Sequence, residues 1–249
     1  MGRRIAIGDI HGCLLTLQNL LEKKIRVEPE DQLYFVGDYI DRGPDSKGVL
    51  DYLINLREDG QQMVFIRGNH EEMLIESFSS ETFFHPWIYN GGGSTLKSFG
   101  ISKEEYLDLP GDQKLPAKYM EFLSHTTYYV ELDKVFIVHA GFNFNDENPF
   151  HDLDAMIWSR NFDYDRFKAK GKPVIHGHTP TSMDSIRKTL FEPERKLVNI
   201  DAGCVYTEYP EMGNLIALEI DKWQLFIQPN IEPEGEWDSF LESEPDRKQ

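Results

Sequence analysis

Short apolar runs that each end in a polar residue recur along the chain. They cover residues 3–9, 32–38, 63–69, 134–141, 173–178 and 196–203. Their near-continuous apolar character is expected of strands that are covered on both faces. Between the first three runs, residues 13–24 and 46–59 place leucine, valine and isoleucine at helical spacing. The first 75 residues therefore predict a β-α-β-α-β unit with parallel strands and right-handed crossovers.

Residues 76–130 show a different pattern. The first half is rich in aromatic residues and glycine, and the second half reads as helical with a break marked by proline. We interpret this segment as an insertion between strands that shapes access to a ligand. The three glycines at 91–93 leave two alternatives open, a flexible hinge or a point of tight packing.

The C-terminal part predicts a hairpin, formed by residues 214–221 and 223–230. We therefore expect one domain over residues 1–230, followed by an acidic tail at 231–249. We expect the tail to be mobile, with Trp237, Phe240 and Leu241 as the residues able to dock.

The charge balance narrows the function classes. The 249 residues include 43 acidic and 26 basic side chains, for a formal net charge of −17. This disfavours nonspecific binding to nucleic acid and to anionic membranes, but it leaves room for a local basic pocket that holds phosphate. The two cysteines form no disulfide framework, and no signal peptide or membrane-spanning run is present in the sequence. These features predict a soluble, cytoplasmic protein.

Polar side chains follow the predicted strands at the point where each strand ends. They are Asp9, Asp38, Asn69, His139 and His178. Because the carboxyl ends of parallel strands meet at one edge of a sheet, we expect these side chains to lie close together. Turn chemistry accounts for the aspartates and the asparagine, but it does not call for histidine. The sequence therefore predicts a functional site at this edge.

The neighbouring residues extend this set. His11 follows in "GDIHG", Asp41 and Arg42 follow in "GDYIDRG", and His70 follows in "RGNHE". A mixed cage of carboxylate, amide and imidazole suits Mn²⁺, Fe²⁺ or Zn²⁺ better than Ca²⁺ or a thiolate-bound structural zinc. A shared aspartate can bridge two such ions for in-line attack at phosphorus.

Five motifs in this order resemble those of the phosphoprotein phosphatase family of binuclear metallophosphatases. They are GDxHG, GDxxDRG, GNHE, HAG and GHTP, spread over residues 3–205. The stretches "WIYNGGG" (87–93) and "MIWSR" (156–160) are similar to those of small bacterial and phage protein phosphatases. The resemblance implies an α/β fold of the calcineurin-like metallophosphoesterase type, a β-sandwich of two stacked mixed sheets that is flanked by helices.

The resemblance also implies roles for the site residues. Two divalent ions, Mn²⁺ or alternatively Fe or Zn, are implied to be held by Asp9, His11, Asp38, Asn69, His139 and His178. Asp38 is implied to bridge the ions, and a hydroxide between them to attack phosphorus in line. His70 is implied as the general acid, with Asp41 orienting its imidazole. Arg42 and Arg160 are implied to clamp the phosphate, assisted by Asn69.

Two residues compete with this assignment. His176 lies two positions before His178, so a continuous strand would place both side chains on the same side. The family pattern favours the histidine that precedes Thr-Pro, and we expect His176 to lie behind the ligands or in the core. For Asp201, both a place behind the ligands and a turn remain open.

These features together predict a metal-dependent phosphomonoesterase that acts on phosphoserine and phosphothreonine. Its partners would be phosphorylated proteins or small phosphoesters, and not nucleic acid or membranes. One alternative is a hydrolase of dinucleoside polyphosphates such as diadenosine tetraphosphate. Glu71 and Asp41 favour the protein phosphatase, because close relatives with the other activity tend to differ at these two positions. An inactive metal-binding scaffold would require a lost ligand or acid, and none is missing.

Overall fold

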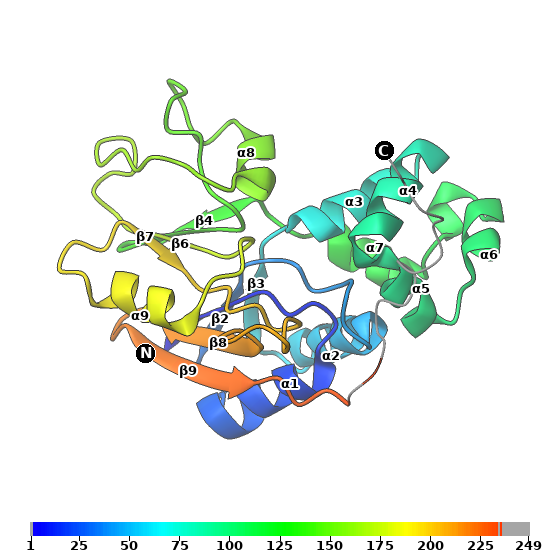
Figure 1. Cartoon of the computed structure of the whole chain (residues 1–249), viewed down its shortest axis with the longest axis horizontal. Coiled ribbons are helices and arrows are strands. Elements are labelled where there is room, and N and C mark those ends of the chain that lie inside the picture. Colours follow the sequence, from blue (N-terminus) through cyan, green and yellow to red (C-terminus); the bar gives the residue numbers. More distant parts are fainter. Residues whose placement is uncertain (1, 234, 236–249) are drawn as a thin grey trace.

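Two sheets form the centre of the fold, in a computed structural model that describes residues 2–233 and 235 (Figure 1). The five-stranded sheet has the order β3-β2-β1-β8-β9, and the four-stranded sheet has the order β4-β5-β6-β7. The first contains β1 (Arg4–Ile7), β2 (Gln32–Phe35), β3 (Gln62–Phe65), β8 (Asn214–Glu219) and β9 (Gln224–Pro229). The second contains β4 (Tyr129–Glu131), β5 (Phe136–Val138), β6 (Val174–His176) and β7 (Leu197–Asn199).

The predicted β-α-β-α-β unit is confirmed. Its helices are α1 (Leu14–Asn19), which continues as the π-helical turn η1 (Leu20–Ile25), and α2 (Ser46–Glu58). Strand β1 pairs in parallel with β2, and β2 pairs in parallel with β3. The predicted C-terminal hairpin is formed by β8 and β9, and β8 pairs antiparallel with β1. The sheet is therefore mixed, as the resemblance implied.

The continuous apolar runs reflect burial on both faces of the five-stranded sheet. Ile5 and Ile7 of β1 join the cluster that holds the apolar faces of α1 and α2. Ala6, which points the other way, joins a cluster with Ile137 and Ile175 from the four-stranded sheet. The helices and the second sheet therefore cover opposite faces, so no polar alternation is needed.

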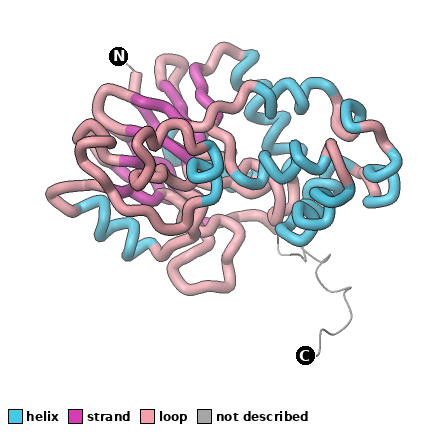
Figure 2. The backbone as a smooth tube through the Cα atoms, turned by 90° about the horizontal axis from the view of Figure 1, so that it is seen from above, coloured by secondary structure: helices cyan, strands magenta, loops and turns pink. Residues whose placement is uncertain are grey.

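The segment interpreted as an insertion is a helical unit on one side of the sheets (Figure 2). Helix α3 (Asn69–Ser77) leads into it, and the segment itself contains α4 (Glu81–Trp87), η2 (Ile88–Gly92), α5 (Gly93–Phe99), α6 (Lys103–Asp108), η3 (Gly111–Gln113) and α7 (Ala117–Ser124). The chain then returns to the end of β3, where Thr127 bridges to Ile66. The short strand β4 follows and pairs antiparallel with β5, and the sequence analysis did not predict it.

Two more helices, α8 (Leu153–Trp158) and α9 (Met183–Phe191), accompany the four-stranded sheet. Beyond β9, Glu232 accepts a hydrogen bond from the backbone N–H of Thr16 at 2.9 Å, so the chain remains in contact with α1. The tail residues Trp237, Phe240 and Leu241 lie outside the described residues. Within the described part of the chain, no helix has the length and apolar character to cross a bilayer.

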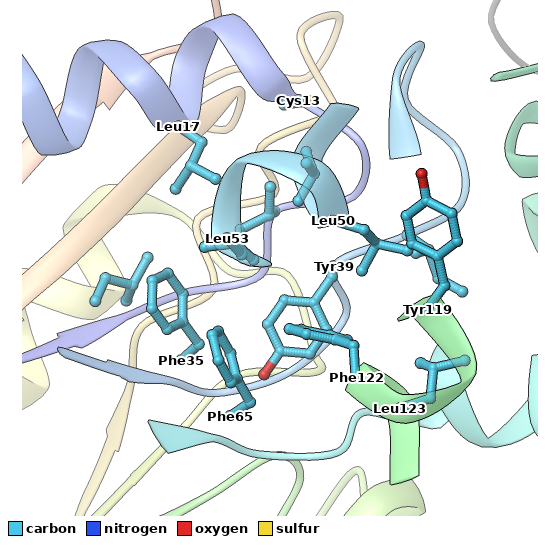
Figure 3. Close-up of a cluster of buried hydrophobic side chains, with 14 of the residues drawn as sticks. Cys13, Leu17, Phe35, Tyr39, Leu50, Leu53, Phe65, Tyr119, Phe122 and Leu123 are labelled. Atoms are coloured by element: carbon cyan, nitrogen blue, oxygen red, sulfur yellow. The ribbon is translucent and has the colours of Figure 1, made fainter. Parts of the chain in front are cut away.

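Aromatic packing fastens the helical unit to the first sheet (Figure 3). The ring of Phe122 in α7 lies 5.5 Å from the ring of Tyr39 and 4.7 Å from that of Phe65, centroid to centroid. Phe122 is fully buried. Edge-to-face and tilted contacts of this kind add to the free energy of burying the rings.

Replacing this ring should therefore destabilise the whole fold. We expect Phe122→Ala to lower the free energy of unfolding by about 3–5 kcal/mol, because it leaves a cavity between α7 and the sheet. Urea denaturation followed by circular dichroism measures the change. Phe83→Ala is the matched control, since Phe83 is 42% exposed. An equal effect of the two substitutions would contradict the role given to Phe122.

Candidate metal centre

The strand ends bring the predicted polar side chains together around Asp38. Asp38 Oδ1 lies 3.5 Å from His139 Nε2, and Asp38 Oδ2 lies 3.5 Å from His11 Nε2. Two groups of side chains have ligand atoms within 4.8 Å of one another: His11, Asp38 and His70, and Asp38, His139 and His178. Asp38 belongs to both groups, which is the arrangement that a bridging carboxylate requires.

On one side of Asp38, three possible ligand atoms converge. Asn69 Oδ1 lies 3.0 Å from His139 Nε2 and 2.9 Å from His178 Nδ1, and the two nitrogens are 3.2 Å apart. His139 donates its Nδ1 proton to the carbonyl of Val36 at 3.0 Å, which leaves a lone pair on Nε2. One amide oxygen and two imidazole nitrogens facing one point are a suitable ligand set for a divalent transition metal.

On the other side of Asp38, His11 is prepared in the same way. Its Nδ1 proton goes to the carbonyl of Ile40 at 2.9 Å, so Nε2 is the acceptor. In this structure Arg42 Nη1 donates to that nitrogen at 2.8 Å. Asp9 accepts the backbone N–H of His178 through Oδ2 at 3.0 Å, while its Oδ1 has no partner.

The unpartnered atoms support a metal site at this place. Among the described residues, the buried side-chain nitrogen or oxygen atoms without a hydrogen bond are Asp9 Oδ1, His70 Nε2 and His178 Nε2. All three lie at this edge, although buried polar atoms are normally satisfied. A bound cation would satisfy Asp9 Oδ1, so the residues present fit a binuclear metal centre.

The pKa shifts at the centre also favour a bound cation. Burial raises the pKa of Asp38 to about 7, and burial together with the charges of Asp201 and Asp38 raises the pKa of Asp9 well above its usual range. Burial also lowers the pKa of His139 and of His178 to about 3. Neutral imidazoles beside crowded carboxyl groups lack positive charge, and cations would supply it.

His70 is held differently from the other histidines. Its Nδ1 lies 2.8 Å from Asp41 Oδ2, while its Nε2 has no partner and lies 4.0 Å from Asp38 Oδ2. Asp41 in turn accepts hydrogen bonds from Thr95 Oγ1 at 2.6 Å and from Trp87 Nε1 at 2.9 Å. The predicted pair of His70 and Asp41 is therefore present. The sequence analysis missed Trp87 and Thr95 as its support, although "WIYNGGG" contains the tryptophan.

Two of the three glycines at 91–93, Gly91 and Gly92, are points of tight packing. Gly91 has a φ of 105°, and a Cβ there would come within 2.7 Å of the Arg42 side chain. A Cβ on Gly92 would come within 2.5 Å of the Trp87 ring. Only glycine therefore lets the helical unit approach the segment that carries Asp41 and Arg42.

Glu71 is a further buried carboxylate whose role the sequence analysis did not identify. It accepts the backbone N–H of Tyr39 through Oε1 at 2.8 Å, and those of Asp38 and Gly68 through Oε2 at 2.9 and 3.0 Å. These amides come from the segments after β2 and β3. Glu71 therefore fixes the two turns that present Asp38 and Asn69.

The remaining predicted residues lie at different distances from the centre. Arg42 reaches His11, as described, and its guanidinium lies 5.9 Å from the ring centroid of Tyr206, a residue that the sequence analysis missed. Arg160 is exposed, and its charge is among those that lower the pKa of His178. Asp201 is buried, and it accepts the N–H of Gly203 at 2.9 Å.

His176 and His178 do not share a side. His178 has a φ of 71°, which breaks the strand alternation at this point. His176 instead packs edge-to-face on Phe162, with ring centroids 5.5 Å apart, and its Nδ1 lies 3.2 Å from the carbonyl of Gly177. His178, and not His176, is the histidine beside Asn69 and His139.

Comparisons with known proteins agree with this geometry. The chain is 27% identical to an asymmetrical bis(5'-nucleosyl)-tetraphosphatase, PrpE of Anoxybacillus flavithermus, over 91% of this chain and 94% of that protein. It is 45% identical to serine/threonine-protein phosphatase 1 of Salmonella typhimurium, over 34% of this chain and 37% of that protein.

A crystal structure of a protein provisionally named a diadenosine tetraphosphatase has a similar fold. The TM-score is 0.62 at 22% sequence identity, and the match covers 93% of this chain and 95% of that one. Residues 2–206 match the calcineurin-like phosphoesterase family, whose members use a binuclear divalent metal site. Together with two ligand groups that share Asp38, this match shows that the chain is a hydrolase that belongs to the calcineurin-like phosphoesterase family.

Proposed function

We propose that this chain hydrolyses dinucleoside polyphosphates such as diadenosine tetraphosphate in a metal-dependent reaction. The observation that supports this substrate class is the share of the chain that each relative matches. Similarity to the tetraphosphatase extends over nearly the whole chain, whereas similarity to the serine/threonine phosphatase is confined to about a third of it. The second candidate is the serine/threonine protein phosphatase that the motifs favoured, and the high identity within that third supports it.

Glu71 and Asp41 no longer favour the protein phosphatase. Both side chains are fully buried. Glu71 is occupied by three backbone amides, and Asp41 by His70, Trp87 and Thr95. Neither side chain reaches the space where a substrate would bind, so their identity carries no information on what lies beyond the phosphate.

In this proposal, Asp9, His11, Asp38, Asn69, His139 and His178 hold two divalent ions, with Asp38 shared. When bound, the ions, for which we propose Mn²⁺, supply an acidified water and neutralise phosphoryl charge. Backbone carbonyl groups of the protein orient two of these ligands: the carbonyl of Val36 fixes the tautomer of His139, and that of Ile40 fixes the tautomer of His11.

The charged side chains around the centre then bind the phosphate. Arg42 and Arg160 pair with phosphoryl oxygens, and the amide of Asn69 assists them. In the free protein, Arg42 donates to His11 Nε2, an acceptor that a metal ion would take. Binding of metal would therefore release the guanidinium toward the substrate.

In this proposal, His70 protonates the leaving oxygen. Its Nε2 is free of protein partners and faces the centre, and Asp41 on Nδ1 stabilises the imidazolium. Burial and the charge of Arg42 lower the pKa of His70 well below its usual range. The negative charge of a bound phosphate acts in the opposite direction, since it favours the protonated form.

A substrate panel tests the proposed function. We expect the Mn²⁺-loaded protein to have a kcat/KM for diadenosine tetraphosphate at least about 10-fold above that for a phosphoserine peptide, because only the first substrate carries nucleosides to bind. A chelator should abolish both activities, and Mn²⁺ should restore them better than Mg²⁺. Faster turnover of the phosphopeptide would support the second candidate instead, and full activity without metal would exclude both.

The role of His70 is tested by leaving-group dependence. We expect His70→Asn to keep its metal and to lose about 10²-fold or more in kcat on an alkyl phosphate, but distinctly less on nitrophenyl phosphate. An alkoxide needs a proton to leave, whereas nitrophenolate hardly does. Metal content is measured in the same preparation. Equal losses on both substrates would show that His70 only positions the phosphate, and loss of metal would make His70 a ligand.

The role of Glu71 is tested through metal affinity. We expect Glu71→Gln to weaken Mn²⁺ binding about 10-fold or more, because one amide oxygen cannot accept from all three backbone N–H groups that position Asp38 and Gly68. Calorimetric titration with Mn²⁺ measures the dissociation constants. Glu76→Gln, an exposed position on the same helix α3, is the control. Wild-type affinity in Glu71→Gln would remove Glu71 from the positioning of the site.

A further inference from the structure

A cavity of about 480 Å³ lies beside the metal centre, and none of the roles above uses it. Its wall includes Phe142, which directly follows the "HAG" segment, and Trp158 at the end of α8. The Trp158 ring is 6.5 Å from that of His178, centroid to centroid. The cavity is therefore at the same edge of the four-stranded sheet as the metal ligands.

The lining of the cavity is aromatic and polar but not basic. Trp158 and Phe162 provide ring surfaces, Asn143 and Asn161 provide amides, and Asp154 provides a carboxylate. None of the lining residues, all of which the structure describes, is lysine, arginine or histidine. The cavity is therefore unsuited to a phosphate group. It suits an uncharged planar group that also donates hydrogen bonds.

We propose that this cavity is the subsite for a nucleoside of the substrate, an inference that rests on the proposed function. The Trp158 side chain is 41% exposed and can stack on a nucleobase. Carboxylates such as Asp154 accept hydrogen bonds from ribose hydroxyl groups, as acidic residues do in dinucleotide-binding proteins. The size of the cavity lies within the range of ligand pockets.

Residues 158–161 connect the proposed nucleoside subsite with the proposed phosphate site. Arg160, proposed to bind phosphate, lies between Trp158 and Asn161, which line the cavity. One segment would thus contact a phosphate through Arg160 and the attached nucleoside through its neighbours.

A basic peptide is the rival occupant, since the lining contains acidic residues. One of these, Asp152, is already occupied within the protein. It accepts from the backbone N–H of Ala155 and from Asn143 Nδ2, both at 2.9 Å. The ring surfaces of Trp158 and Phe162 also favour a flat aromatic ligand over a lysine side chain.

Adenosine, which carries no phosphate, tests the subsite independently of hydrolysis. We expect it to quench the tryptophan fluorescence of the metal-loaded full chain in a saturable way. Calorimetry should show binding that is about 10-fold weaker or more in Trp158→Ala, because the stacking surface is lost. Phe167→Ala is the matched control, since Phe167 is 94% exposed and does not line the cavity. Binding of a lysine-rich peptide but not of adenosine would overturn the assignment.

Kinetics on two substrates provide the second arm. We expect Trp158→Ala to lower the ratio of kcat/KM for diadenosine tetraphosphate to that for nitrophenyl phosphate about 10-fold, and Phe167→Ala to preserve it. Equal losses on both substrates would overturn the subsite, because Trp158 would then merely support His178. If the wild type does not hydrolyse diadenosine tetraphosphate, the proposed function fails, and the adenosine titration alone decides on the cavity.

Discussion

The carboxylate of Glu71 joins the segments that follow β2 and β3, and the geometry around Asp38 depends on it. Asp38 has a φ of 52°, a conformation that is unfavourable for residues other than glycine. The N–H of Asp38 is bound by Glu71, and Asp38 Oδ1 accepts the N–H of His70 at 3.2 Å. Gly68 makes this approach possible, since a Cβ there would lie 2.1 Å from Asp38 Oδ1. The strain at Asp38 persists because its surroundings fix it on several sides.

The helical unit holds Asp41, the partner of His70, in position. It was interpreted as a segment that shapes access to a ligand, and that role stays a prediction. Trp87 and Thr95 instead donate hydrogen bonds to Asp41, which binds Nδ1 of His70, the ring nitrogen opposite the free Nε2. The aromatic packing of Phe122 against the first sheet keeps the unit in register with the site. Stability of the fold and orientation of the proposed acid are thus properties of the same contact region.

The sequence predicted the strands and the polar side chains at their ends because both depend on local pattern. Continuous apolar runs follow from burial on both faces, and parallel topology brings the ends together. The features it missed depend on contacts between distant segments. Glu71 accepts the N–H of Asp38, 33 residues away in the sequence, and Trp87 donates to Asp41, 46 residues away. Strand β4, which has two half-buried residues and one exposed residue, offers no apolar run to detect.

The sequence pattern also did not predict the backbone conformation at the site. Nine non-glycine residues of the described chain have a positive φ, and five of them are His11, Asp38, Asp41, Arg42 and His178. Strained residues gather where ligands must be presented in an unusual direction. The motif residues are buried at the proposed metal centre, where several adopt strained conformations and support one another, and they account for the reaction class. Substrate choice must come from residues that face outward, such as Trp158 beside the cavity, which lies outside the five ordered motifs.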